Sequence, residues 1–286
     1  MGGWKNEWFL GKGRRQLLVQ VNGFTMKHLT HIADQFTEAF YTRSWPGGSR
    51  YDFDRLSAQE AYQVQSLVTQ AKINRGERVV GYKVGCTSTA IQKQFGLNAP
   101  ILAPIFQPRI YSSDAHFMLR DFVDCAIEPE MVIKIGRTLF GKSLSDEELL
   151  NGITSVSPGI ELHHYRFWRQ PPCLSELICS GGIHAGLVVG GVEASPRSLN
   201  FESERFSVYL DDQLEAEALA MEIMGGPLKS LRWLVSELSK QDKALEAGAL
   251  VIPGSPTPLL PIPPKERCQL RVEIDHVGSV SCTFSP

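Results

Sequence analysis

The chain has 286 residues, of which 43% are hydrophobic and 21% are charged, a balance typical of a folded globular protein and not of a disordered one. A formal net charge of -2 gives no basic footprint for nucleic acid, and no apolar run is long enough to cross a membrane. The six cysteines form no Cys-x-x-Cys pair, which argues against structural zinc and favours reduced thiols in a cytoplasmic protein.

The N-terminal segment, residues 1–76, is expected to be an extension followed by helices. Residues 1 to about 15 are basic and Gly-rich, and they show no signal-peptide pattern. Apolar residues at helical spacing predict a helix from Thr25 to Phe40. A capping box that begins at Ser57 predicts a second helix, which should end at Gly76.

The remaining residues, 77–286, are expected to form a catalytic β-rich domain. Short runs with the length and composition of strands are Val79–Gly85, Ile127–Ile135, Ser155–Leu162, Gly186–Gly190, Phe206–Leu210, Leu250–Ile252, Cys268–Ile274 and Gly278–Phe284. A short helix is predicted after the capping box at Ser145, and a longer one begins at Gly226-Pro227. Because short strands outnumber helices, the sequence predicts an α+β fold built on a curled sheet.

Two carboxylates lie two residues apart in the predicted strand that begins at Cys125. Alternate side chains of a strand share one face, so Glu128 and Glu130 should project side by side, roughly 7 Å apart at their Cβ atoms. Their repulsion, about 4 kcal/mol at roughly 4 Å in a dielectric near 20, favours a cation between them. Glu161, at the end of another apolar run, would complete a three-carboxylate site for Mg²⁺. The alternative is that Glu128 and Glu130 are solvated acids on a half-buried strand.

Several short segments follow one another in a recognisable order. They are Arg78–Gly85, Ile127–Glu130, Gly159–Glu161, Met224–Pro227, Pro253–Thr257 and Val277–Val280. In this order and spacing, over roughly residues 55 to 286, they resemble the 2-oxopent-4-enoate hydratase and 4-oxalocrotonate decarboxylase family of the fumarylacetoacetate hydrolase superfamily.

The resemblance implies a fold and a site. The fold would be a distorted β-barrel or β-roll with outer helices and an N-terminal helical segment, with the active site at its mouth. The site would hold Mg²⁺ or Mn²⁺ on Glu128, Glu130 and Glu161, with Lys83 as a catalytic or substrate-orienting residue. The alternative for Lys83 is a lysine whose ammonium group extends to solvent from a half-buried strand.

Three segments depart from the pattern of that family. The predicted loop after the lysine strand, Leu97–Pro104, lacks the expected acidic residue, Ser180-Gly181 replaces Asp-Asn, and Pro253 replaces Thr. The metal ligands are kept while part of the substrate-facing surface has changed. We therefore expect altered specificity, with slow or absent hydration of the simple dienoate.

Further polar residues are candidates for the site. Of the pair His163-His164, one would face the pocket as a proton carrier, and His184 would supply another donor; the alternative is that these histidines are polar caps at strand ends. Ser255 and Thr257 would bind a substrate carboxylate, although turn formation alone accounts for them.

The sequence thus predicts a divalent-metal-dependent lyase, a hydratase or decarboxylase, acting on a small 2-oxo acid through a metal-stabilised enolate. Lys83 would anchor a substrate oxygen or carry a proton, with a pKa lowered by burial beside a dication. The alternatives are a C–C bond hydrolase or oxaloacetate-type decarboxylase of the same superfamily, or a catalytically idle relative that binds a metabolite. The resemblance also implies a homo-oligomer, and neither nucleic acid nor membrane is an expected partner.

Overall fold

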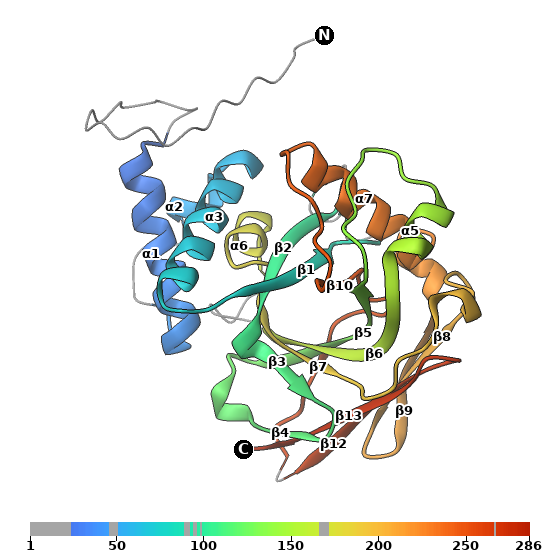
Figure 1. Ribbon diagram of the computed structural model, residues 1–286. Coiled ribbons are helices and arrows are strands. Elements are labelled where there is room, and N and C mark those ends of the chain that lie inside the picture. Colours follow the sequence, from blue (N-terminus) through green and yellow to red (C-terminus); the bar gives the residue numbers. More distant parts are fainter. Residues whose placement is uncertain are drawn as a thin grey trace.

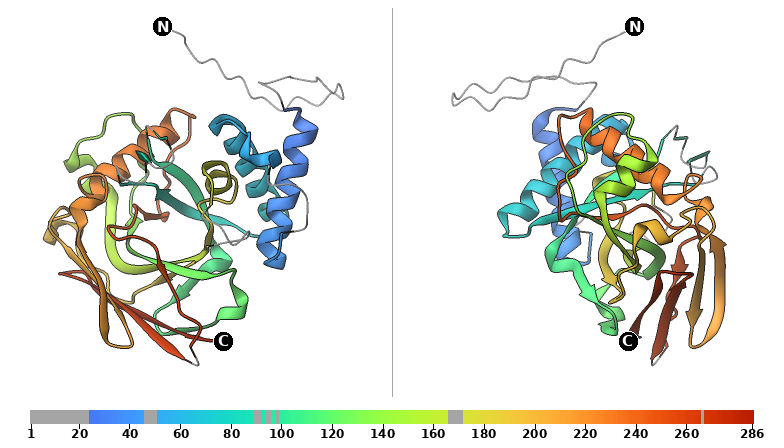
Figure 2. Two further views of the ribbon diagram at one scale, coloured as in Figure 1. Left: turned by 180° about the vertical axis from the view of Figure 1, so that it is seen from behind. Right: turned by 45° about the vertical axis from the view of Figure 1, so that its right-hand side comes forward.

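The computed structural model describes residues 24–45, 51–88, 92–93, 96–97, 99–165, 172–265 and 267–286. Two sheets and two groups of helices make up this part of the chain, as Figures 1 and 2 show. The predicted extension at residues 1–15 and the residue Asn98 of the predicted acid-free loop lie outside the described residues. No helix within the described ranges is both long and apolar enough to span a membrane.

The larger sheet is mixed and curls around the centre of the molecule (Figure 1). Its strands are β1 (Val79–Gly85), β2 (Ile101–Phe106), β3 (Ile110–Ser112), β5 (Cys125–Ile135), β6 (Ile153–His164), β7 (His184–Val189), β10 (Leu250–Ile252) and β11 (Leu260–Pro261). They lie in the order β2-β1-β10-β5-β6-β7-β3, with β11 paired to β5. This order brings the strand that carries Lys83 to within two strands of the one that carries Glu128 and Glu130.

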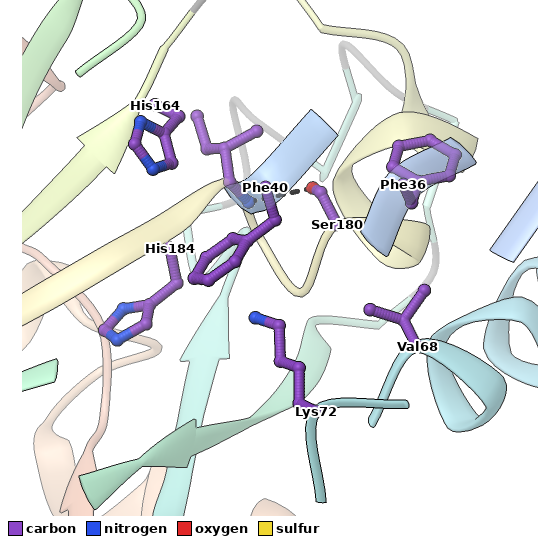
Figure 3. A pocket seen from close by; sticks show the side chains of 8 residues that line it. Phe36, Phe40, Val68, Lys72, His164, Ser180 and His184 are labelled. Atoms are coloured by element: carbon purple, nitrogen blue, oxygen red, sulfur yellow. Dashed lines mark hydrogen bonds between the residues drawn. The ribbon is translucent and has the colours of Figure 1, made fainter. Parts of the chain in front are cut away.

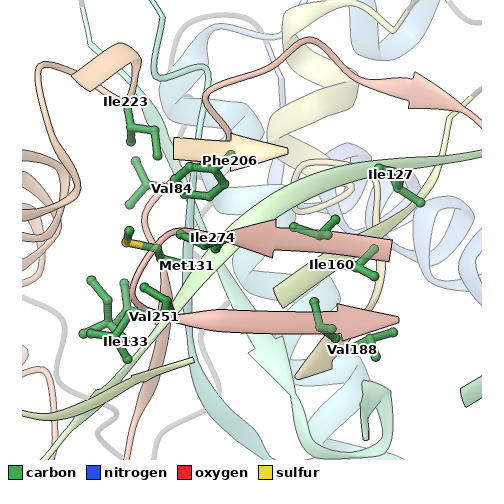
Figure 4. Packing of buried hydrophobic residues seen from close by; sticks show 14 of the residues in the cluster. Val84, Ile127, Met131, Ile133, Ile160, Val188, Phe206, Ile223, Val251 and Ile274 are labelled. Carbon is green, nitrogen blue, oxygen red and sulfur yellow. The ribbon is translucent and has the colours of Figure 1, made fainter. Parts of the chain in front are cut away.

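The smaller sheet has five strands in the order β4-β13-β12-β8-β9. Their bounds are β4 (Ala115–Met118), β8 (Arg205–Leu210), β9 (Gln213–Leu219), β12 (Cys268–Ile274) and β13 (Gly278–Ser285). The main hydrophobic core contains buried residues of both sheets, among them Met131 of β5, Ile160 of β6, Phe206 of β8 and Ile274 of β12 (Figure 4). Packing between the sheets therefore fixes β5 and β6, the two strands with the glutamates.

Helices lie in two groups outside the sheets (Figure 1). One group is α1 (Met26–Thr42), α2 (Tyr51–Asp54), α3 (Ala58–Asn74) and α6 (Leu174–Cys179), which share a second hydrophobic core. The other is α5 (Asp146–Gly152) and α7 (Pro227–Ser239), which contact each other. The capping boxes at Ser57 and Ser145 are both formed, so these two predicted helix starts are confirmed.

One predicted loop is a strand. Residues 101–106 form β2, paired antiparallel to β1, although Leu97–Pro104 was expected to be a loop. Pro104 is compatible with β2 because this strand lies at the edge of the sheet, where a missing N–H breaks no ladder bond. Side chains of α3 cover that edge: the Gln65 amide donates to Leu102 O at 3.1 Å, and Leu102 N donates to the Tyr62 hydroxyl at 3.2 Å.

The predicted α+β class with a curled sheet and N-terminal helices is confirmed. The division into segments 1–76 and 77–286 stays a prediction. Helices α1 to α3 share their core with α6, which belongs to the second segment. The strands β3, β4 and β9 were not expected from the sequence.

Candidate metal centre

Pairing between β5 and β6 brings the predicted glutamates together. In the antiparallel register Glu128 lies opposite Glu161, and Glu130 lies opposite Gly159. Directly opposed residues on neighbouring strands have their Cβ atoms about 4.5–5.5 Å apart. Two segments separated by a helix in the sequence therefore place their acidic side chains at one point.

A histidine belongs to the same cluster. Within the described ranges, single ligand atoms of Glu128, Glu161 and His163 all lie within 4.8 Å of one another. The His163 Nε2 atom is 3.1 Å from Glu128 Oε2 and 3.8 Å from Glu161 Oε2. Glu130 is not a member of this group, although the sequence placed it among the metal ligands and placed His163 among the proton carriers.

Glu130 lies beside the group and is fully buried, with 1% of its surface exposed. The backbone N–H of Gly254 donates to its Oε2 at 3.0 Å, and its Oε1 has no hydrogen-bond partner among the described residues. Burial raises the pKa of Glu130 well above its ordinary value, and the negative charges of Glu161 and Glu128 raise it further. The positive charge of Lys83 and the Gly254 N–H lower this pKa but do not offset the other effects, so negative charge is in excess around Glu130, as expected at a cation site.

Lys83 lies at the same point, on β1. Its Nζ forms a buried ion pair with Glu161 and donates to Gly182 O at 3.3 Å. Lys83 and Glu161 are 3% and 0% exposed, so the alternative of a lysine that reaches solvent is wrong. Close backbone packing holds this strand in place, because a Cβ at Gly81 would lie only 1.8 Å from Leu250 O on β10.

The buried pair shifts both pKa values in the direction that keeps both groups charged. Burial alone would raise the pKa of Glu161, but the positive charge of Lys83, with His163 and His184, holds it well below its ordinary value. Burial alone would lower the pKa of Lys83, but Glu161 and Glu128 raise it. The protein's own groups therefore raise the pKa of Lys83, because those around it are acidic, and the lowered pKa expected beside a bound dication stays a prediction.

The other two candidate histidines differ in their surroundings. His184 Nδ1 lies 2.8 Å from Glu161 Oε1, and burial lowers the pKa of His184 to about 4, so its neutral ring donates to that carboxylate. His164 faces away from the glutamates; its Nδ1 accepts from Val123 N at 3.3 Å, and burial lowers its pKa to about 3. Of the pair, His163 is the one that faces the carboxylates.

Ser255 and Thr257 lie in the turn that follows β10. The Ser255 hydroxyl donates to Thr257 O at 3.0 Å and accepts from Thr257 N at 3.2 Å, which are bonds within the turn itself. The hydroxyl of Ser230, on α7, donates to Pro253 O at 2.6 Å and anchors the turn. The backbone N–H of Gly254, in the same turn, donates to Glu130, a contact that side-chain patterns in the sequence do not reveal. Substrate binding by Ser255 and Thr257 stays a prediction.

These donors fit a hard divalent ion. The buried oxygens Glu130 Oε1 and Glu161 Oε2 have no hydrogen-bond partner among the described residues, and such orphaned acceptors are costly unless something binds them. Carboxylate oxygens suit Mg²⁺ and Mn²⁺, and no cysteine belongs to the described ligand group.

Comparison with known proteins finds similar hydratases and decarboxylases. No family model matches the chain. It is 24% identical to the 2-oxo-hept-4-ene-1,7-dioate hydratase of Escherichia coli over 261 residues, covering 89% of this chain and 97% of the relative. It is 26% identical to a 4-oxalocrotonate decarboxylase from a Pseudomonas species over 228 residues, covering 80% and 87%. Over most of its length the chain is similar to 2-keto-4-pentenoate hydratases and 4-oxalocrotonate decarboxylases.

A solved structure supports the same fold. The 4-oxalocrotonate decarboxylase of Pseudomonas putida G7, complexed with magnesium and adipate, matches with a TM-score of 0.85 at 21% sequence identity. The match covers 91% of this chain and 98% of that one. The resemblance to these hydratases and decarboxylases and the α+β fold with a curled sheet, both expected from the sequence, are confirmed.

Proposed function

We propose that this protein is a divalent-metal-dependent lyase, a hydratase or decarboxylase, that acts on a small 2-oxo acid. The observation that carries the proposal is the buried Lys83–Glu161 pair beside two buried carboxylate oxygens, Glu130 Oε1 and Glu161 Oε2, that have no hydrogen-bond partner among the described residues. Burying several charged side chains is costly, and such clusters are typical of catalytic or ligand-binding sites. The names of the relatives, which are hydratases and decarboxylases of 2-oxo acids, support the same reaction class.

Glu128, Glu130 and Glu161 would hold the ion, Mg²⁺ or Mn²⁺, with His163 beside it. When bound, such an ion supplies Lewis-acid stabilisation of the negative charge that develops at the C2 oxygen of a 2-oxo acid. Glu128 is the most accessible of the three, with 24% of its side chain exposed, so it borders the side from which substrate would enter.

Lys83 would move a proton at the substrate or hold one of its oxygens. Its Nζ is fixed from two directions by Glu161 and the Gly182 carbonyl. A Cβ at residue 182 would lie 2.9 Å from that Nζ, so a glycine there keeps the ammonium group uncrowded.

His184 would orient Glu161, and His163 would orient Glu128, through the hydrogen bonds that join each histidine to its carboxylate. Ser255 and Thr257 would contribute to binding of the substrate carboxylate. The homo-oligomer and the cytoplasmic location remain predictions.

Turnover of a panel of 2-oxo acids tests the proposal. With Mg²⁺ present, we expect loss of the ultraviolet absorbance of the enol or dienol form of at least one 2-oxo acid, and no loss after the metal is chelated. Hydration of the simple five-carbon dienoate should be slow, because Ser180-Gly181 and the acid-free stretch before β2 differ from the family's pattern. A kcat/KM above about 10⁴ M⁻¹s⁻¹ for that dienoate would show that these changes are harmless. Absence of metal-dependent turnover across the panel would contradict the function itself.

A further inference from the structure

A left-handed turn joins α6 to β7 beside the metal centre. Gly181, Gly182 and Ile183 have backbone φ angles of 73°, 73° and 53°, three consecutive values in the left-handed region. Gly181 ends α6 in the usual way: its N–H donates to Ile178 O at 3.1 Å, and the Gly182 N–H donates to Leu177 O at 2.6 Å. Single residues normally visit the left-handed region, so this turn continues beyond what ending the helix requires.

Ile183 is the unusual member of this turn. A β-branched residue in the left-handed region is strained, and such strain is found most often at functional sites. Ile183 is 3% exposed, and its carbonyl accepts from His164 N on β6 at 2.9 Å. Its backbone N–H donates to the Ser180 hydroxyl at 3.0 Å (Figure 3). The same hydroxyl donates to Leu177 O at 3.3 Å, so Ser180 joins the turn to α6.

The turn presents two groups to the metal centre. The carbonyl of Gly182 accepts from Lys83 Nζ at 3.3 Å. The ring of His184, the first residue of β7, has its Nδ1 2.8 Å from Glu161 Oε1, and Lys83 pairs with that same oxygen. Two donors therefore hold Glu161 Oε1, which leaves Oε2, without a hydrogen-bond partner among the described residues, to face a cation.

Both contacts depend on the backbone at Ile183, which lies between Gly182 and His184. A change in its dihedral angles would move the Gly182 carbonyl and the His184 ring relative to each other. The packing leaves little room for such a change, because a Cβ at residue 182 would lie only 2.9 Å from Lys83 Nζ and 3.0 Å from its Cε. A displacement of the turn is therefore passed directly to the ammonium group.

The two ends of the turn are held in different ways. At its start, α6 is anchored to α3, because the Gln65 amide donates to Ile178 O at 2.9 Å. At its end, β7 is held by its pairing with β6. Between these anchors, the hydrogen bonds of the Ser180 hydroxyl cross the turn from α6 to the backbone of Ile183.

We propose that Ser180 is a positioning residue of the metal centre: its hydroxyl fixes the left-handed turn that holds Lys83 and Glu161 in place. Without the hydroxyl, the buried N–H of Ile183 loses its acceptor, and the strained conformation loses a bond that maintains it. The turn then relaxes, and both Lys83 and the free oxygen of Glu161 shift. The effect on turnover rests on the proposed function, whereas the effect on Mn²⁺ affinity rests on the metal centre alone.

A calorimetric Mn²⁺ titration of Ser180→Ala tests the proposal. The variant should bind Mn²⁺ about tenfold more weakly than the wild-type protein, as when a group that orients metal ligands is lost. Ser180→Thr keeps the hydroxyl and should bind as the wild-type protein does.

Ser175→Ala is the matched control. Ser175 is a buried serine at the other end of α6, and its hydroxyl donates to Leu56 O at 3.2 Å. Its loss removes a comparable hydrogen bond and should leave the Mn²⁺ affinity at the wild-type value. Wild-type affinity in folded Ser180→Ala would overturn the proposal. An equal loss of affinity in Ser175→Ala would overturn it too, because the cause would then be a general destabilisation of α6.

A pair of glycine variants tests the contact with Lys83. Gly182→Ala places a Cβ 2.9 Å from Lys83 Nζ, whereas Gly76→Ala, at another left-handed glycine with a φ of 92°, meets no atom within 4 Å. Both variants carry the same kind of backbone strain, so kcat should fall by about tenfold or more in Gly182→Ala alone. Equal kcat in the two variants would overturn the role of the turn in positioning Lys83. If Ser180→Ala weakens Mn²⁺ binding while the wild-type protein turns over no 2-oxo acid, the positioning role stands and the lyase function falls.

Discussion

Replacing Lys83 with methionine should lower kcat for the protein's preferred 2-oxo acid by about 10²-fold or more, the effect of losing a positioned acid or base. The ammonium group of Lys83 is held at the glutamates by Glu161 and Gly182 O, and methionine fills a similar volume without a charge or a donor. Binding of the metal should not weaken, because the variant removes a cation that competes for Glu161. Steady-state kinetics and a Mn²⁺ titration of the same preparation measure both effects.

Lys134→Met is a matched control for this variant. Lys134 is a strand lysine of the same sheet, but its side chain is 45% exposed and its ion pair with Glu193 spans 3.3 Å at the surface. Such a pair contributes about 1 kcal/mol or less, so its loss should change neither turnover nor stability appreciably. Wild-type turnover in Lys83→Met would contradict a catalytic role for Lys83 and leave it a structural one.

Replacing Glu161 with glutamine should both abolish turnover and destabilise the metal-free protein by about 3–5 kcal/mol, the usual cost of breaking a buried ion pair. The variant leaves the Lys83 ammonium group buried without its carboxylate partner. The glutamine side chain has one oxygen to accept hydrogen bonds from both Lys83 and His184, and its NH₂ group cannot accept from either. Urea unfolding in the presence of a chelator measures the change in the free energy of unfolding.

Glu130→Gln serves as the comparison for Glu161→Gln. Glu130 is as deeply buried and also faces the other carboxylates. Among the described residues, however, the Gly254 N–H is the one hydrogen-bond donor to it, and its pKa is raised, not lowered. A raised pKa means that the folded protein favours the neutral form, so a neutral isostere should cost little stability near neutral pH. Equal destabilisation by the two variants would show that charge compensation by Lys83 does not distinguish the two glutamates.

Local patterns predicted much of this protein because they depend on neighbouring residues. The capping boxes at Ser57 and Ser145 begin helices, and the run from Cys125 to Ile135 is a strand. The acidic spacing of Glu128 and Glu130 indicated a cation site, and β-pairing places Glu161 opposite Glu128. These inferences needed only strand periodicity and the mutual repulsion of carboxylates.

The rest depends on which distant segments meet. Strand β2 was missed because Pro104 suggests a loop unless the strand is known to lie at an edge covered by α3. His163 joins the ligand group only through the register of β5 and β6. The burial of Lys72, on α3, has no local signal at all, since a lysine on an amphipathic helix is normally solvated, and its burial arises from Phe40 and Phe106 on other elements.

The central claim is that the glutamates of β5 and β6 form a divalent-metal site, and a calorimetric Mn²⁺ titration tests it most directly. Wild-type protein should bind one ion per chain, and Glu128→Gln should bind it at least about tenfold more weakly, since loss of even an outer partner of a metal site costs that much. Glu193→Gln is the control, because Glu193 is an exposed acid whose ion pair with Lys134 of β5 lies at the surface. This variant should bind Mn²⁺ as the wild-type protein does. Equal Mn²⁺ affinity in the wild-type protein and Glu128→Gln would contradict the metal centre.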